Sequence, residues 1–233
     1  MGTQFKIAVS VPQLGNVRHL ACQEVRPWNV PEGVRDQFRR VLSTLNLATR
    51  QGSICLAVSS TCRGEGVSWV TAMLSCAIAE ESGPVFLIDY NLRHPTQTQV
   101  FGVDEKPETP VTLSDADDLH SRRAPRFDIC ILTPEANSSR GQEFGMSLRD
   151  ALPILRQRNK VILIDCEPMR DSSQLLDLAP AIDGVVFVVE AERERREVVA
   201  RNLESIGRAG VRVFGIVLNK RKRYIPDWLY RAL

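Results

Sequence analysis

Two glycines and a serine within the stretch S-S-T-C-R-G-E-G-V-S-W (residues 59–69) have the spacing of a loop that binds phosphate. Glycines let backbone N–H groups point at phosphate oxygens, and the helix that follows such a loop adds the positive end of its dipole. Gly64 and Gly66 stand where the turn needs them, and Ser68 stands where a hydroxyl ligates Mg²⁺. The lysine that should reach the β- and γ-phosphates is replaced by Val67. The loop is therefore predicted to keep its backbone cradle and to lack its main cation.

Two aspartates that end apolar runs are candidate ligands for a magnesium ion. Asp89 ends the run P-V-F-L-I-D, and Asp165 ends the run V-I-L-I-D. Carboxylate oxygens are ligands that Mg²⁺ prefers, so these aspartates and Ser68 form the predicted metal site. Asp89 and Asp165 are also the candidate catalytic groups, because a carboxylate at a strand end can hold metal-bound water or accept a proton. The alternative for each is a structural role as a helix cap or a buried hydrogen-bond acceptor.

A regular alternation of apolar runs and helical stretches must position these residues. The runs are nearly continuous in Val, Ile, Leu and Phe, which is typical of strands covered on both faces. The order predicts an α/β fold with a doubly wound, mainly parallel sheet of about six to eight strands between two helical layers. Ligands bind such a sheet at the carboxyl ends of its strands, where Asn219 is a candidate for the adenine edge. The predicted strands are 54–59, 84–89, 127–133, 161–165, 184–190 and 212–219, and the predicted helices are 34–50, 67–81, 142–158, 172–180 and 194–209.

One domain of residues 34–220 is predicted, with a short segment on either side. Residues 1–33 are predicted to form an N-terminal arm with one short strand near residues 7–11. Residues 221–233 are predicted to form a basic and aromatic C-terminal tail. The polar stretch 96–126 is predicted to be a mobile insertion, because it is long and has no clear hydrophobic period.

Composition and charge argue against several classes of protein. The 233 residues are 43% hydrophobic and 25% charged, as in an ordinary globular protein. The net charge of +2 is too small for a protein that coats nucleic acid, so no nucleic-acid partner is predicted. No window reaches the ~20 apolar residues that span a bilayer, and the first residues lack a signal-peptide pattern. We therefore expect the chain in the cytoplasm, or on a membrane through a partner. None of the six cysteines forms a C-x-x-C pair, which gives little support for a zinc site or a disulfide framework.

The ordered motifs resemble those of the cytoplasmic kinase domain of bacterial polysaccharide co-polymerases. These bacterial tyrosine kinases, of the CpsD and CapB type, are P-loop relatives of MinD and ParA, and the resemblance covers about residues 33–220. Their phosphate loop follows S-S-x-P-G-E-G-K-S-T, of which this chain keeps Ser59, Ser60, Gly64, Glu65, Gly66 and Ser68. It departs from that pattern at Arg63, Val67 and Trp69. In the later motifs the family's residues are kept at Asp89, Arg93, Pro95, Asp165 and Pro168, whereas Asn91 replaces an aspartate and Glu167 a proline.

The resemblance also implies cofactors, interfaces and partners. It implies that ATP or ADP, bound weakly or not at all, would lie on Ser60, Gly64, Glu65, Gly66, Ser68 and Asn219, with Mg²⁺ at Ser68, Asp89 and Asp165. The family's oligomerisation pattern E-x-x-R-x-x-R falls on Asp36, Arg39 and Leu42, so the implied interface residues are Asp36, Arg39 and Arg93. Tyr224 and Tyr230 stand in for the family's phosphorylated tyrosine cluster, with a packing role as the alternative. The implied partners are a Wzz-like membrane co-polymerase, further copies of this chain, and an anionic membrane surface that meets the tail.

Loss of the loop lysine leads to a functional hypothesis. Phosphoryl transfer depends on positioned charge, and removing one preorganised group of this kind costs on the order of 10²-fold in rate. We therefore expect a catalytically impaired, tyrosine-kinase-like protein (a pseudokinase) that acts in exopolysaccharide or capsule biosynthesis or export. It would be cytoplasmic and peripherally associated with the inner membrane through its partner. The alternatives are an active tyrosine autokinase with an atypical loop and a MinD/ParA-like regulatory ATPase.

Overall fold

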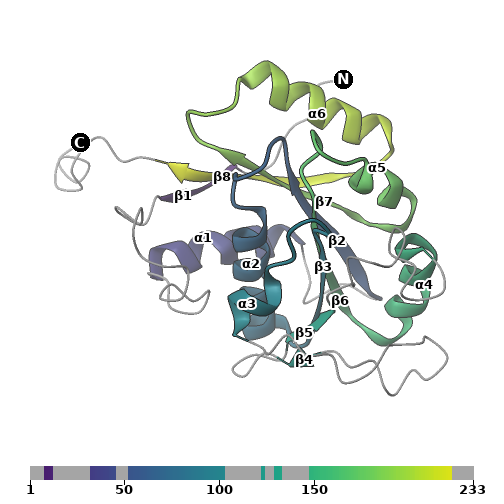
Figure 1. Ribbon diagram of the computed structural model, residues 1–233. Helices are drawn as coiled ribbons and strands as arrows, with labels where there is room; N and C mark the ends of the chain where they lie inside the picture. The colour runs from purple at the N-terminus through teal and green to yellow at the C-terminus, as the bar shows by residue number, and fades with distance from the viewer. Residues whose placement is uncertain are drawn as a thin grey trace.

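An eight-stranded sheet forms the middle layer of the structure (Figure 1). The computed structural model describes residues 8–12, 32–45, 52–102, 122–123, 129–132 and 147–221. The strands are β1 (Ala8–Pro12), β2 (Ile54–Ser60), β3 (Val85–Tyr90), β4 (Arg122–Arg123), β5 (Ile129–Leu132), β6 (Val161–Cys166), β7 (Gly184–Glu190) and β8 (Val213–Arg221). Their order across the sheet is β1-β8-β7-β2-β6-β3-β5-β4, and all neighbours are parallel except β4 and β5. The predicted doubly wound, mainly parallel sheet is thus confirmed.

Helices cover both faces of this sheet (Figure 1). One layer consists of α1 (Glu32–Leu45), α2 (Val67–Ser82) and α3 (Gln97–Phe101). The other consists of α4 (Leu148–Arg158), α5 (Gln174–Leu178), a 3₁₀ turn η2 (Ala179–Ala181) and α6 (Arg196–Arg208). A separate apolar cluster lies under each layer, which completes the predicted three-layer arrangement.

The central strand β6 shows why the apolar runs become buried strands. Val161 and Leu163 pack into the cluster under α2, whereas Ile162 and Ile164 pack into the cluster under α4. Successive side chains of a strand point to opposite faces, so a strand covered on both sides must be apolar at nearly every position. Asp165 breaks this pattern near the carboxyl end of the strand, although it is also fully buried.

The prediction of a mobile insertion over residues 96–126 is wrong where the structure describes it. Its first residues form α3, and β4 near its end pairs antiparallel with β5. The short helix is held because Phe101 is only 1% exposed and lies in the cluster that includes α2. A single buried aromatic ring in a polar stretch gives no hydrophobic period, which is why the sequence pattern did not reveal the helix.

The ends of the predicted elements agree with the structure to within a few residues where both are described. β1 lies where a short strand is predicted and pairs in parallel with β8. The helix predicted from residue 142 begins at Leu148, because the Ser147 side chain accepts a hydrogen bond from the backbone N–H of Asp150 and caps it. Residues 46–50 and 142–146, at the ends of two predicted helices, lie outside the described residues.

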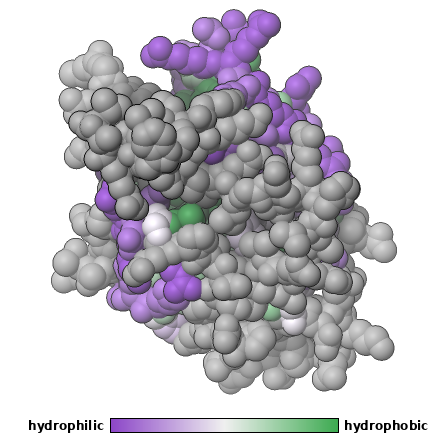
Figure 2. Space-filling model, turned by 90° about the vertical axis from the view of Figure 1, so that its left-hand side faces the viewer, coloured by the Kyte–Doolittle hydropathy of each residue, from purple (hydrophilic) through white to green (hydrophobic). Residues whose placement is uncertain are grey.

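The outermost helix, α6, has a polar outer surface. Leu203 and Ile206 are buried against the sheet, while most residues of the helix are exposed. The upper part of the face in Figure 2, where α6 lies, is accordingly mostly hydrophilic. Within the described ranges, no helix combines the length and the apolar character needed to cross a bilayer.

Candidate functional site

The carboxyl ends of four parallel strands bring the predicted site residues to one edge of the sheet. The phosphate-loop sequence links β2 to α2, and Asn219 lies on β8. Asp89 on β3 and Asp165 on β6 are register partners in neighbouring parallel strands. The Asn219 side chain donates a hydrogen bond to the carbonyl oxygen of Glu65, 2.8 Å away, which joins the end of β8 to the loop. The sequence therefore identified correctly which segments meet.

The loop backbone depends on its glycines. Gly64 and Gly66 have φ angles of 88° and 92°, in the left-handed region that glycine adopts without steric cost. A Cβ atom at Gly66 would collide with the side-chain amide nitrogen of Asn219. At the start of the loop, the Ser60 hydroxyl donates to the carbonyl oxygen of Cys62 at 3.0 Å. The loop thus adopts a tight turn directly before α2.

Val67 opens α2 and belongs to the apolar core. Its side chain is 8% exposed and packs in the cluster under α1, α2 and α3. A valine has no charge to offer to phosphate, and burial in the core directs its methyl groups away from solvent. The predicted loss of the loop cation is therefore accompanied by a gain of core packing at the same position.

Glu65 and Asn219, which were predicted to contact nucleotide, bind the loop itself. The buried Glu65 carboxylate accepts hydrogen bonds from the backbone N–H of Cys62 at 2.6 Å and of Glu190 at 3.0 Å. The Asn219 side-chain oxygen accepts a hydrogen bond from the backbone N–H of Lys220 at 2.9 Å. Both side chains therefore fix the loop between the ends of β7 and β8, and the prediction that Asn219 reads adenine stays a prediction.

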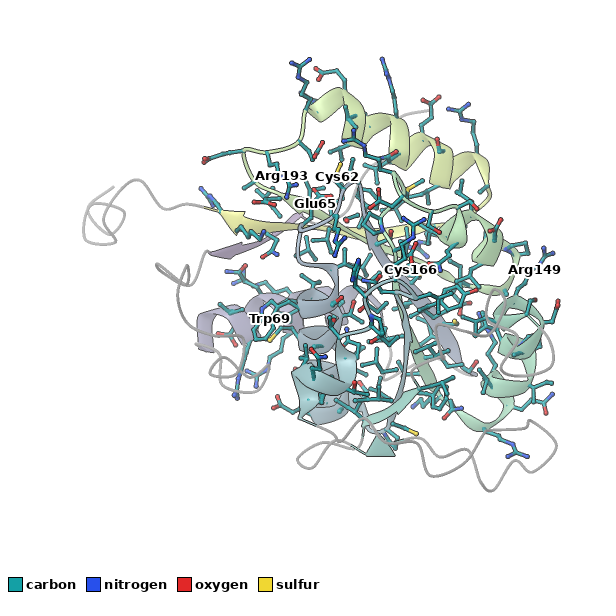
Figure 3. The ribbon with its side chains drawn as sticks, in the orientation of Figure 1. Cys62, Glu65, Trp69, Arg149, Cys166 and Arg193 are labelled. Carbon is teal, nitrogen blue, oxygen red and sulfur yellow. The ribbon has the colours of Figure 1, made fainter. Side chains whose placement is uncertain are left out.

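Two cations that were not predicted to contact the phosphate loop lie beside it. Lys220 Nζ donates to the Gly64 carbonyl oxygen at 2.5 Å and lies 3.2 Å from Glu190 Oε2. Arg193 Nη1 lies 2.8 Å from the same Glu190 oxygen, and Figure 3 shows Arg193 close to Glu65. Burial acts to raise the pKa of Glu190, but hydrogen bonds from Arg193 and Lys220 outweigh it and lower that pKa. Lys220 and Arg193 thus place two cationic groups next to Gly64, together with the carboxylates of Glu190 and Glu65.

The two aspartates are buried and held by few donors. Asp89 Oδ2 accepts hydrogen bonds from the backbone N–H groups of Thr96 and Gln97, both at 2.8 Å. Burial raises the pKa of Asp89, and its backbone hydrogen bonds only partly offset this. Burial and then the charge of Asp89 raise the pKa of Asp165, against hydrogen bonds from the side chains of Gln97 and Ser68. Both carboxyls therefore hold protons more strongly than an ordinary aspartate.

Gln97 joins the aspartates to the phosphate loop, and sequence reasoning missed it. Its side-chain nitrogen donates to Asp165 Oδ2 at 2.7 Å and to the Ser68 carbonyl oxygen at 2.9 Å. Gln97 is fully buried at the first position of α3. The available sequence signal is the place of Gln97 directly after L-R-H-P-T, the motif that follows Asp89. Gln97 itself, however, falls in the stretch 96–126 that is predicted to be an insertion.

Several buried oxygen atoms of Gln97 and its neighbours in the site have no hydrogen-bond partner. Asp89 Oδ1, Asp165 Oδ1, Gln97 Oε1 and Thr96 Oγ1 are buried and have no hydrogen-bond partner. Carboxylate, amide and hydroxyl oxygens are the ligands that Mg²⁺ takes, so the donor set fits the predicted magnesium ion. Within the described part of the chain no three His, Cys, Asp or Glu side chains gather in one place, so neutral oxygens would have to complete the shell.

The predicted interface residues make contacts within the chain. Arg39 Nη1 lies 3.1 Å from Asp36 Oδ1, and Arg39 Nε lies 3.1 Å from Glu81 Oε1. The contact with Glu81 ties α1 to the end of α2. Arg93 Nε lies 3.6 Å from a carboxylate oxygen of Glu167, the residue that replaces the family's proline. All three predicted residues retain exposed surface, and their role between chains stays a prediction.

The predicted phosphorylation sites cannot be placed. Tyr224 and Tyr230 lie in residues 222–233, outside the described residues. The last described residue is Arg221, at the end of β8. The predicted contact of the tail with an anionic membrane therefore also stays a prediction.

Comparison with known proteins bears on the class of the fold first. No protein-family model matches the chain. The kinase domain of the Escherichia coli tyrosine kinase ETK superposes with a TM-score of 0.74 at 16% identity, over 95% of this chain and 92% of that one. MinD of Pyrococcus horikoshii, complexed with Mg-ADP, superposes with a TM-score of 0.57 at 22% identity, over 77% of this chain and 76% of that one. The chain has a P-loop NTPase-like fold, as predicted.

A curated relative makes the likeness more specific. The putative tyrosine-protein kinase CapB of Staphylococcus aureus is 22% identical over 194 residues, which are 80% of this chain and 84% of CapB. The resemblance to bacterial tyrosine kinases that the motifs predict is thereby confirmed.

Proposed function

We propose that this chain is a catalytically impaired, tyrosine-kinase-like protein that acts in exopolysaccharide or capsule biosynthesis or export. The relatedness to bacterial tyrosine kinases supports the class, and one observation carries the impairment. Val67 stands where the loop lysine belongs, and its side chain is buried in the core. A lysine at that position neutralises the charge that develops on the β- and γ-phosphates, and its loss costs on the order of 10²-fold in rate.

The neighbouring cations do not restore this function. Lys220 donates a hydrogen bond to the Gly64 carbonyl oxygen, and Glu190 neutralises part of its charge. Arg193 is likewise paired with Glu190. To reach a phosphate, either side chain would have to break these contacts, and a positioned charge that must first be released loses the advantage of preorganisation.

Weak nucleotide binding is part of the proposal. The backbone of the loop between Ser60 and Gly66 would hold the phosphates, with Asn219 beside the base. Ser68, Asp89 and Asp165 would hold Mg²⁺, which supplies positive charge that neutralises phosphate oxygens. The fully buried carboxylates would ionise more readily beside such a charge.

Partners complete the proposal. A Wzz-like membrane co-polymerase would hold the chain at the inner membrane, and the exposed Asp36, Arg39 and Arg93 would contact it or further copies of this chain. The basic and aromatic residues of the tail would add contact with anionic lipid headgroups. Co-purification of a tagged chain with membranes from cells that do or do not contain the co-polymerase measures this part separately. Equal recovery from both membranes contradicts a docking role for the partner.

Phosphotyrosine formation tests the impairment directly. The purified full chain is incubated with ATP and Mg²⁺, and phosphotyrosine is measured by mass spectrometry. The chain has three tyrosines, so a variant with Phe at Tyr90, Tyr224 and Tyr230 is the matched control. We expect equal, background signal from both proteins. A signal from the natural chain that the Phe variant lacks contradicts the proposal.

Two specific observations keep alternatives in view. The Lys220 and Arg193 cations near Gly64 favour an active autokinase with an atypical loop, which the same phosphotyrosine assay would reveal. The structural likeness to MinD favours a regulatory ATPase, for which ATP should drive dimerisation. Light scattering with and without ATP separates this alternative, because the pseudokinase proposal expects no change in mass.

A further inference from the structure

The Gln97 side chain occupies the centre of the acidic site. Its nitrogen contacts Asp165 Oδ2 and the Ser68 carbonyl oxygen, and its own backbone N–H contacts Asp89 Oδ2. One residue thus joins the first turn of α2 with the ends of β3 and β6. Gln97 is fully buried, so water does not compete for these bonds.

The chemistry of its partners fixes the orientation of the amide. The Ser68 carbonyl oxygen can only accept a hydrogen bond, so the side-chain nitrogen of Gln97 must face it. The same nitrogen lies 2.7 Å from Asp165 Oδ2, and the Gln97 oxygen faces away, where it has no partner. An amide NH₂ group carries partial positive charge but no lone pair for a metal. It satisfies one Asp165 oxygen as a cation would, and at the same time it bars a cation from that oxygen.

We infer that Gln97 keeps the cation site closed by placing its NH₂ group where a divalent cation would bind Asp165. A cation enters only when the side chain turns its amide over, so that Oε1 replaces the nitrogen, or leaves the site. Turning over would convert Gln97 from a competitor into a ligand beside Asp89 and Asp165, each of which has an oxygen without a partner. Turning over also breaks the hydrogen bond to Ser68, so cation binding is coupled to the position of the first turn of α2, which directly follows the phosphate loop.

This inference rests on the proposed function in one respect, namely that Ser68, Asp89 and Asp165 form the cation site of the loop. Nucleotide and phosphotyrosine do not enter it. The experiment can therefore use the metal alone, and its outcome is separate from that of the kinase assay. A chain that binds cations readily and forms no phosphotyrosine would refute the closure and leave the pseudokinase proposal standing.

The test is a Mn²⁺ titration of the full chain without nucleotide, followed by electron paramagnetic resonance of free Mn²⁺ and by thermal unfolding. Gln97→Glu keeps the shape and replaces the NH₂ group with an anionic ligand. We expect it to bind Mn²⁺ at least about tenfold more tightly than the natural chain, because ligand charge sets the affinity of such sites. Its melting temperature should rise with Mn²⁺, whereas that of the natural chain should not. Gln99→Glu, at an exposed position of the same helix, is the matched control and should behave like the natural chain.

A second variant keeps the test decisive. Gln97→Ala removes the NH₂ group without adding charge and should also bind Mn²⁺ more tightly than the natural chain. If Gln97→Glu does not fold, this variant decides alone. The added substitution Asp165→Asn should abolish the gain, which locates the cation. Equal Mn²⁺ affinity of the natural chain and the Gln97 variants, or an equal gain in Gln99→Glu, overturns the inference.

Discussion

Replacement of Gly66 by alanine should destabilise the chain strongly, because two separate costs fall on one position. Gly66 has a φ of 92°, and an alanine in this left-handed region costs about 1–2 kcal/mol. The new Cβ would also collide with the Asn219 amide and displace it from the Glu65 carbonyl oxygen. Loss of that buried hydrogen bond costs about 1 kcal/mol. Together the free energy of unfolding should fall by about 2–3 kcal/mol.

Urea unfolding followed by circular dichroism measures this loss. With a slope of about 2–3 kcal/mol per molar urea, the midpoint of Gly66→Ala should fall by roughly 1 M. Gly210→Ala is the matched control, because Gly210 has a φ of 79° and a Cβ atom added there would meet no other atom within 4 Å. It carries the backbone cost alone, so its midpoint should fall by about half as much.

A double-mutant cycle with Asn219→Ala isolates the collision. Asn219→Ala removes the group that the new Cβ would strike, so Gly66→Ala should cost less in that background than in the natural chain. The difference, about 1 kcal/mol, is the coupling between the two positions. If Gly66→Ala costs no more than Gly210→Ala, or if the two substitutions at Gly66 and Asn219 are additive, Asn219 does not hold the loop as described.

Three further predictions concern charge. Asp89 and Asp165 have raised pKa values in the folded chain, whereas aspartates of the unfolded chain lose their protons near pH ~4. The free energy of unfolding should therefore fall as the pH rises from about 4 through the raised pKa values. Urea midpoints at about pH 5 and about pH 8 measure this, and an equally steep profile in Asp165→Asn would contradict it. Arg39→Ala removes ion pairs of a half-exposed side chain, so the free energy of unfolding should fall by less than about 1 kcal/mol. The same substitution should lower the mass of the proposed oligomer in light scattering. An oligomer of unchanged mass contradicts the interface role. Val67→Lys should tighten Mg-ADP binding in calorimetry by about tenfold or more, equal to about 1.4 kcal/mol, and no gain would show that the missing cation does not limit nucleotide binding.

The sequence was sufficient for the sheet and for the segments that meet at its edge. Continuous apolar runs specify buried parallel strands, and the rule that ligands bind at their carboxyl ends then selects Asp89, Asp165 and Asn219 without knowledge of any distance. The register that pairs Asp89 with Asp165 comes from the structure, because the sequence analysis predicts neither the order nor the register of the strands. These inferences hold because they depend on patterns of several residues rather than on one side chain.

The sequence was insufficient for the contacts that decide what the site can bind. Gln97 lies 68 positions from Asp165 along the chain, and no local pattern marks a hydrogen bond over that separation. Lys220 and Arg193 reach Glu190 from different segments, so their gathering beside Gly64 depends on side-chain direction. The burial of Val67 is likewise a property of the packed helix α2.

The departures from the kinase motifs compensate one another in charge. Val67 removes a cation from the site, and Asn91, which replaces the second aspartate, removes an anion. Had only the lysine been lost, a third carboxylate at the partly buried position 91 would follow the buried Asp89 without a compensating cation, and burial of unpaired charge is strongly destabilising. With Asn91 in place two carboxylates remain, and Gln97 satisfies one of them while raised pKa values favour protonation of both. The natural chain thus has a site that is stable without a bound cation, and restoring the lysine alone restores only one half of a balanced pair.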